Sequence, residues 1–321
     1  MRIIIATLVL FLFSSFYSYS QTKPFEGVIK LKVDLKSKSP DMSEDAMKVI
    51  FGVSPDVTVY TKKNKQRHTS SAGDSYYLGD QKKLYMKFKN VDTLYVVDYS
   101  KSSPKPTSTG KTAEKKNVAG YDCEVSSMKG EDGTRKFYYS AQLPMDPELF
   151  KGMEIGNYDI YAKATSSMWL ALEEESDIYK VYQEAVSVTP KPVDDSVFKL
   201  PSLPQAPYDI EKILITPTYD RNGGWASYLQ KNLDVDLAAK YVKIPRGETS
   251  GLQSVLVKFQ VTDKGIVENA RVVNTKDVHP KLAQEALRVV NESGRWTPAS
   301  IYGIKIPYTM QQPVTFVISK N

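Results

Sequence analysis

Apolar and polar residues alternate along much of this chain, and this alternation limits the fold to one built mainly of antiparallel strands. Every second position from Phe25 to Leu35 is apolar or glycine, with charged residues such as Lys30 and Lys32 between them. A period of two buries one face of a strand and leaves the other face wet. Shorter runs rich in Tyr, Val and Phe follow up to Val188, separated by turn pairs. We therefore predict a curved antiparallel sheet, or half-barrel, with few helices. A capping box of Asp41 and Glu44 predicts one of these helices.

Two polar, proline-bearing stretches divide the chain. Residues 100–117 (SKSSPKPTSTGKTAEKKN) have the composition of an exposed loop. Residues 200–218 contain four prolines, and each proline disfavours helix in the residue before it. This second stretch is typical of an interdomain linker. We predict a first domain at residues 22–204, a linker at 205–219 and a second domain at 220–321.

The second domain carries helix signals as well as strand signals. Residues 225–233 fit a helix, and residues 254–274 fit a hairpin whose turn ends in a glycine that can take a positive φ. A further helix begins at a proline, which suits the first helical position, and ends at a glycine, which suits a C-terminal cap. We therefore predict an α+β domain. The scaffold residues are Gly265, Pro280, Leu287, Gly294, Trp296 and Pro298.

The last residues show the longest alternation in the chain. The apolar members all fall on even positions: Ile304, Ile306, Tyr308, Met310, Val314, Phe316 and Ile318. Pro307 and Pro313 lie between them and lack the N–H that a central strand needs. We therefore predict an edge strand, or a strand with a break near Gln311–Pro313.

The N-terminus predicts export. Arg2 precedes an apolar run from Ile3 to Phe16, and Ser18 and Ser20 place small residues before a cleavage point at Gln21. This is the layout of a secretory signal peptide, here residues 1–20. The alternative is an uncleaved anchor, but the run is shorter than the roughly 20 apolar residues that a span requires. Cys123 is the only cysteine, so no intrachain disulfide forms.

The sequence contains no recognisable catalytic constellation, so we expect no catalytic, cofactor-binding or metal-binding residues. There are two histidines, His68 and His279, which with a single cysteine cannot build a closed zinc site from typical spacings. His279 directly precedes the helix that starts at Pro280, and we interpret it as a cap or surface residue. The acidic run Glu173–Glu175 is interpreted as a solvated helix face or loop. A formal net charge of +6 over 321 residues provides no concentrated basic face for nucleic acid.

Residues ~220–321 resemble the C-terminal domain of the TonB family. The matching pieces are GGWASYLQKNL, SVLVKFQVTDKGIVENARVV, LAQEALRVVNESGRWTPA and the terminal IPYTMQQPVTFVI. The resemblance implies a helix, a hairpin, a helix and a strand, with two helices on one face of the sheet. It also implies a periplasmic partner, an exposed segment of an outer-membrane transporter, added as a strand at the sheet edge. The chain departs from the family in having Asn232-Leu233-Asp234 where a Tyr-Pro pair is usual, and in lacking a long Pro/Lys-rich spacer.

Residues ~22–204 resemble secreted domains whose fold is related to lipoprotein-carrier proteins. The residues that carry this resemblance are FEGVIKLKV, the segment Ala119–Cys123 and DSVFKLP. It implies a half-open barrel with an apolar cavity, but a fold by itself does not identify a ligand.

These features favour a periplasmic, non-enzymatic binding protein that recognises an envelope protein by strand addition. The alternative is a carrier of a lipid, lipoprotein or other apolar ligand in the first domain, and an enzyme ranks third. Pairing of the terminal strand only within its own sheet stays open. The predicted partner-strand residues are Ile304, Ile306, Tyr308, Thr309, Met310, Gln311, Val314, Phe316 and Ile318.

Overall fold

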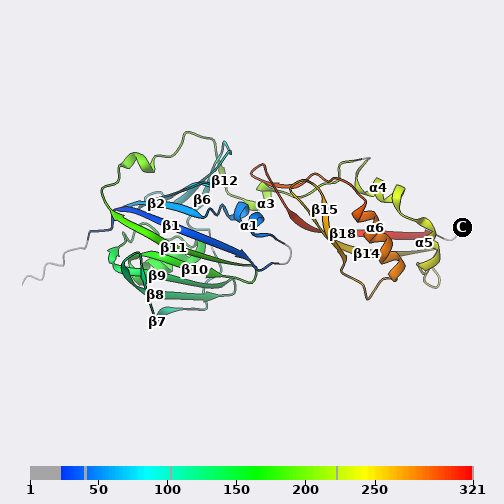
Figure 1. The fold of residues 1–321 in the computed structure, drawn as a ribbon, viewed down its shortest axis with the longest axis horizontal. Helices are drawn as coiled ribbons and strands as arrows, with labels where there is room; N and C mark the ends of the chain where they lie inside the picture. Colours follow the sequence, from blue (N-terminus) through cyan, green and yellow to red (C-terminus); the bar gives the residue numbers. More distant parts are fainter. Residues whose placement is uncertain (1–22, 40–41, 102, 222, 320–321) are drawn as a thin grey trace, which may run out of the picture.

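The computed structural model describes residues 23–39, 42–101, 103–221 and 223–319. The predicted signal peptide, residues 1–20, and the predicted helix cap Asp41 therefore lie outside the described residues. Within these ranges, no helix has the length and apolar character needed to cross a membrane. The fold is α+β, as predicted, with a large curved sheet and a smaller C-terminal domain (Figure 1).

The first domain is one sheet of twelve strands in the order β12-β6-β5-β4-β3-β2-β1-β11-β10-β9-β8-β7. All neighbours are antiparallel except β12, which runs parallel to β6. The strands are β1 (Gly27–Ser37), β2 (Asp56–Lys62), β3 (Lys65–Ser70), β4 (Gly73–Leu78), β5 (Lys83–Phe88), β6 (Leu94–Asp98), β7 (Ser108–Val118), β8 (Tyr121–Gly130), β9 (Gly133–Pro144), β10 (Ser167–Glu175), β11 (Tyr179–Pro190) and β12 (Gln205–Pro207).

Two α-helices pack on the face of this sheet that carries Ile29, Val59 and His68, here called the inner face. Helix α1 (Glu44–Phe51) starts at Ser43, whose side chain accepts from the N–H of Ala46. Its buried Met47 packs with residues of β1 and β11. Helix α2 (Tyr158–Thr165) follows the short 3-10 turn η1 (Ile155–Asn157) and buries Tyr161, whose ring stacks on Phe137 at 4.3 Å. A second 3-10 turn, η2, spans Asp195–Phe198.

Two sequence interpretations of the first domain were wrong. Much of the predicted loop at residues 100–117 is strand β7, an exposed edge that pairs with β8. Its polar composition reflects an edge strand open to solvent rather than a loop. Glu173–Glu175 end strand β10 instead of lying on a helix or loop, and Glu174 pairs with Arg135 of the adjacent strand.

The predicted linker, residues 205–219, contains short elements. These are β12, helix α3 (Ile210–Ile213) and β13 (Leu214–Ile215). β12 attaches to β6 of the first domain, while β13 pairs with β16 (Ala299–Ile301), which pairs in turn with β17 (Ile304–Ile306). This small sheet joins the two domains because Ile301 and Ile306 pack against Val49 and Ile50 of α1.

The C-terminal domain has a three-stranded antiparallel sheet in the order β15-β14-β18. Helix α6 is amphipathic, and its Leu282, Ala286, Val289 and Val290 are fully buried against Val257 and other apolar residues of β14. The helix starts and the hairpin agree with the prediction, and α5 is an additional helix that begins at the cap Asp234. The elements are α4 (Gly224–Asn232), α5 (Val235–Tyr241), β14 (Ser250–Val261), β15 (Val267–Val272), α6 (Pro280–Asn291) and β18 (Tyr308–Ser319).

Candidate binding sites

Strand β18 forms one edge of the C-terminal sheet. It pairs with β14 over its whole length, from Tyr308 opposite Val261 to Ser319 opposite Ser250, without a register shift. Among the described residues no other strand pairs with its outer side. The predicted break near Gln311–Pro313 is absent, and the interruption falls at Pro307 instead, between β17 and β18.

The hydrogen bonds of β14 fix which main-chain groups of β18 face outward. The N–H of Leu256 donates to the side chain of Asn274 at 2.9 Å, and its C=O accepts from the N–H of Val273 at 2.9 Å. Both groups therefore point toward β15. Leu256 lies opposite Pro313, and opposed residues in an antiparallel pair exchange either both hydrogen bonds or none. Pro313 thus exchanges none with β14, and its main chain faces the outer edge.

The same alternation applies along the whole strand. Odd-numbered residues of β18 direct their N–H and C=O groups outward, while even-numbered residues bond to β14. Gln311, Thr315 and Val317 therefore present donors and acceptors at the edge, whereas Pro313 presents only an acceptor. The proline occupies a position where its missing N–H costs the sheet no hydrogen bond, which agrees with the edge-strand interpretation.

The side chains of the predicted partner strand separate into three groups. Val314 and Phe316 are buried in the domain core, and Met310 and Ile318 pack partly against it. Gln311, like Thr315 and Val317, is exposed on the opposite face, and Val317 is 62% exposed. Ile304 and Ile306 lie in β17 at the domain junction, where Ile306 packs in one apolar cluster with Tyr308 and the exposed Ile304 lies near Val49. Thr309 belongs to β18 and pairs with Gln260.

The predicted scaffold residues lie where the hairpin, the last helix and the core meet. Gly265 has a φ of +78°, and a Cβ there would lie 2.1 Å from the carbonyl oxygen of Trp296. Trp296 is buried and donates from its indole N–H to the hydroxyl of Ser293 at 3.0 Å. Pro280 begins α6, Leu287 packs partly against the core, Gly294 has a φ of +80° beyond the helix end, and Pro298 directly precedes β16.

His279 caps helix α6. Its Nδ1 accepts from the N–H of Lys281 at 3.2 Å, and its ring stacks on Tyr241 at 4.1 Å between centroids. Both contacts agree with the predicted capping role. One stabilising group was missed by the sequence reasoning: Glu285 is 7% exposed, accepts from the N–H of Asp234 and pairs with Arg288. The contact of Glu285 with Asp234 joins residues far apart in the sequence, so the spacing of residues along one helix could not show it.

The inner face of the first domain holds a pocket of about 190 Å³, here called the inner pocket. Its lining is mixed, with apolar Val57, Met86 and Phe88 beside polar Ser70, His68 and Gln183. The ring of His68 lies 4.8 Å from that of Tyr77 and 6.4 Å from that of Trp169. Burial among these rings lowers the pKa of His68 to about 4 and raises the pKa of Tyr77 to about 12. His68 is therefore neutral at pH 7.

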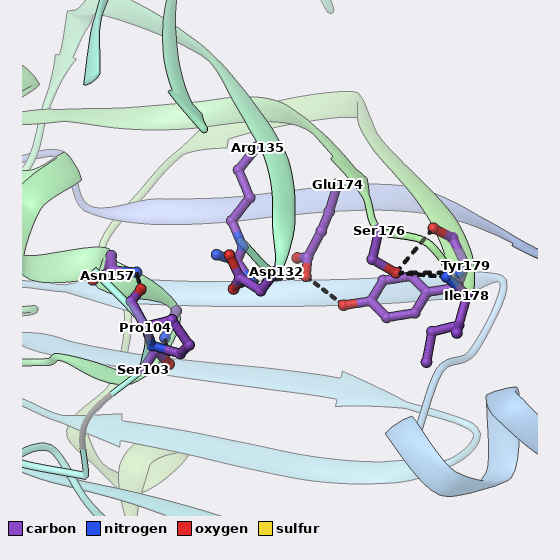
Figure 2. A network of polar contacts seen from close by, with 10 residues as sticks. Ser103, Pro104, Asp132, Arg135, Asn157, Glu174, Ser176, Ile178 and Tyr179 are labelled. Carbon is purple, nitrogen blue, oxygen red and sulfur yellow. Dashed lines mark hydrogen bonds and ion pairs between the residues drawn. The ribbon is translucent and has the colours of Figure 1, made fainter. Parts of the chain in front are cut away.

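A polar cluster closes one end of the same sheet (Figure 2). The guanidinium of Arg135 on β9 donates to Glu174 at 3.1 Å and to Asp132 at 3.2 Å, and the hydroxyl of Tyr179 donates to Glu174 at 2.6 Å. Burial raises the pKa of the Tyr179 phenol, and the neighbouring Glu174 carboxylate raises it further. The two carboxylates satisfy the arginine, so the cluster is a structural tie between β9, β10 and β11.

The described residues contain no group of three or more His, Cys, Asp or Glu side chains arranged to hold a metal ion. Cys123 is buried, and burial raises the pKa of its thiol to about 11, which disfavours the reactive thiolate. The edge of β18 and the inner pocket therefore offer surfaces for binding.

Comparison with known proteins identifies the second domain. The family model of the Gram-negative bacterial TonB protein C-terminal matches residues 251–318, from β14 to β18. The C-terminal domain belongs to the TonB C-terminal family. This family is non-enzymatic in general and is associated with the Gram-negative cell envelope. The match includes the whole β15-β14-β18 sheet apart from its terminal residues, and the TonB C-terminal domain is therefore the part of the chain in which the edge strand lies.

Other comparisons add no functional argument. No curated protein matches the chain. A structure of PNGF-II is 11% identical, covers 75% of this chain and 45% of its own, and has a TM-score of 0.34. A β sliding clamp of C. crescentus is 10% identical, with coverages of 92% and 88% and a TM-score of 0.13. The chain thus spans less than half of the PNGF-II chain, and neither similarity supports a conclusion about fold or function.

Proposed function

We propose that this protein is a periplasmic, non-enzymatic binding protein whose TonB C-terminal domain recognises another envelope protein by strand addition at β18. The partner is an extended segment of an envelope protein, such as an outer-membrane transporter, and the interaction is linked to transport across the outer membrane. The observation that carries this proposal is the outward direction of the main-chain groups of Gln311, Thr315 and Val317.

The chemistry of the edge supports a selective partner. Main-chain hydrogen bonds contribute affinity without regard to sequence, and alternate side chains contribute selectivity. Val317 faces Leu252 of β14 across the pair, and both are exposed, at 62% and 70%. An added strand with an apolar residue on this face would pack beside Val317. Because Pro313 lacks an N–H, the partner residue opposite it would lack one donor.

A substitution at Gln311 tests strand addition. Gln311→Pro removes an outward N–H while leaving the pairing with β14 intact, and Gln311→Ala removes the side chain but keeps the N–H. Crosslinking in intact cells, with quantitative identification of partners, should show an envelope protein captured by the wild type and by Gln311→Ala and at least ten-fold less by Gln311→Pro. Equal capture by the two variants would exclude main-chain recognition at this edge.

The inner pocket supports a second candidate function, the carriage of a lipid, lipoprotein or other apolar ligand by the first domain. The supporting observation is the pocket on the inner face between α1 and the sheet, whose mixed lining includes the apolar side chains of Val57, Met86 and Phe88. Native mass spectrometry of the protein purified from cells should then show a bound apolar species. A spectrum of the protein alone, from preparations in which the fold is intact, would remove this candidate.

A further inference from the structure

Helix α1 contacts both the inner pocket and the C-terminal domain. Its last residue, Phe51, and the following Gly52 line the inner pocket. On its other side, Val49 and Ile50 pack in the apolar cluster of the β16-β17 hairpin. Helix α1 therefore lies between the inner pocket and the junction, and Figure 1 shows it at the end of the first domain nearest the C-terminal domain.

A second pocket of about 180 Å³ lies at this junction and is here called the junction pocket. Its walls come from both domains and are almost entirely apolar. Val49 belongs to α1 and Ala72 to the turn between β3 and β4, while Tyr302 and Ile304 belong to the hairpin of the C-terminal domain. The Tyr302 ring stacks on Phe88 with 3.7 Å between centroids and an angle of 20°.

The two pockets meet at one narrow contact. Both are lined by Gly52, Val53, Ala72 and Phe88. Gly52 has a φ of +62°, and a Cβ there would lie 3.0 Å from Cε1 of Phe88. The two pockets are therefore neighbours, and the ring of Phe88 lies between them beside the backbone of Gly52.

Two lysines lie at the junction pocket, and one of them has no carboxylate partner among the described residues. Lys48 and Lys89 both line the pocket. The ammonium of Lys48 forms ion pairs with Asp45 at 3.4 Å and with Glu44 at 4.0 Å. The exposed Lys89 has no carboxylate partner in the described part of the chain. The apolar junction pocket with a cation at its rim fits an anionic amphiphile, because the chain is buried while the head stays in water beside the ammonium.

We propose that the inner and junction pockets together hold one ligand with an unbranched apolar chain and a carboxylate head, with the head beside Lys89. This inference rests on the carrier function proposed as the second candidate, and it adds the domain junction as the entry of the site. The C-terminal domain then contributes Tyr302 and Ile304 to the binding of the ligand, so that the ligand is in contact with both domains.

Paired ligands test the charged head. Isothermal titration calorimetry at pH 7 with decanoic acid and decan-1-ol compares the same chain with and without a carboxylate. Wild-type protein should bind the acid about ten-fold more tightly than the alcohol. Lys89→Gln should remove this difference and leave the affinity for the alcohol unchanged. Equal wild-type affinities for acid and alcohol would overturn the assignment of the head.

A matched pair of alanine substitutions tests the path of the chain. Ala72→Leu fills the space shared by the two pockets and should weaken the binding of both ligands at least ten-fold, whereas Ala141→Leu makes the same change at an exposed position of β9. Binding that responds to neither Ala72→Leu nor Lys89→Gln would overturn the junction site while sustaining a carrier with another pocket. Absence of binding of both ligands to the wild type would overturn the junction site and weigh against the carrier function, without bearing on strand addition at β18.

Discussion

The turn at Gly265 packs against the backbone of Trp296. A Cβ at this position would lie 2.1 Å from the carbonyl oxygen of Trp296, and φ is +78°. Gly265→Ala should therefore destabilise the C-terminal domain by about 3 kcal/mol, because backbone strain adds to a main-chain clash. Gly303→Ala has a similar φ of +74° but no atom within 4 Å, so only the strain of about 1 kcal/mol applies. Urea unfolding followed by tryptophan fluorescence measures both losses, and equal losses would contradict the role of the clash.

His68 links stability to pH. Its folded-state pKa is about 4 because of burial, below the ordinary value of 6.5. As pH falls below 6.5 the unfolded chain takes up the proton first, so the stability of the folded state is complete above pH 6.5 and is progressively lost toward pH 4. His68→Phe should reduce the loss between pH 6.5 and 5 by about 1 kcal/mol. The same comparison for His279→Asn, a helix-cap residue outside the pocket, serves as the control. The free energy of unfolding is measured by urea titration at each pH. If it falls equally with pH in the wild type and in His68→Phe, His68 is not the group that links stability to pH.

At the scale of elements, β18 has two chemically different main-chain sides. Even-numbered residues bond to β14, so Gln312→Pro should remove a ladder hydrogen bond with Val257 and cost about 3 kcal/mol. Gln311→Pro should cost about 1 kcal/mol or less, because its N–H faces outward. Thermal unfolding of the two variants measures the difference. A larger loss of stability for Gln311→Pro than for Gln312→Pro would mean that the odd-numbered residues, and not the even-numbered ones, bond to β14.

The periodicity of the sequence predicted which segments are helices and strands better than it predicted which segments they pack against. The β14-β15 hairpin, the start of α6 at Pro280 and the first sheet followed from local patterns, because these depend on side chains close together in the chain. The alternation continued through Pro307 although the strand does not. Ile306 is buried in a cluster with Val49 and Ile50 of α1, more than 200 residues earlier in the chain. A period of two reports that a face is buried, but not by which part of the chain.

The same limit applied to the candidate sites. The edge character of β18 could be inferred from Pro313, and the structure supplied the direction in which each N–H points. The inner pocket could not be located from the sequence. His68 and Tyr77 lie on the paired strands β3 and β4, but Trp169 lies on β10, beyond β2, β1 and β11, and approaches His68 only through the curvature of the sheet. The exposed strand β7 was missed because solvent on both faces leaves no apolar alternation to detect.

At the scale of the whole molecule, one aromatic contact joins the domains. Tyr302 has a φ of +54° at the tip of the β16-β17 hairpin, and its ring lies against Phe88 at 3.7 Å and Tyr95 at 5.6 Å. Aromatic pairs add about 0.5–1.5 kcal/mol beyond the area that they bury, and contacts of this size hold domains together without fixing them rigidly. Tyr302→Ala should therefore loosen the junction while leaving each domain folded.

Small-angle X-ray scattering should show a larger radius of gyration for Tyr302→Ala than for the wild type, with unchanged circular dichroism. Tyr241→Ala is the matched control, because Tyr241 stacks on His279 within the C-terminal domain and does not contact the first domain's Phe88 cluster. Its radius of gyration should equal that of the wild type. If Tyr302→Ala also leaves the radius unchanged, the apolar cluster of Ile301 and Ile306 with α1 is sufficient to hold the domains together, and the aromatic stack is not the contact that fixes their arrangement.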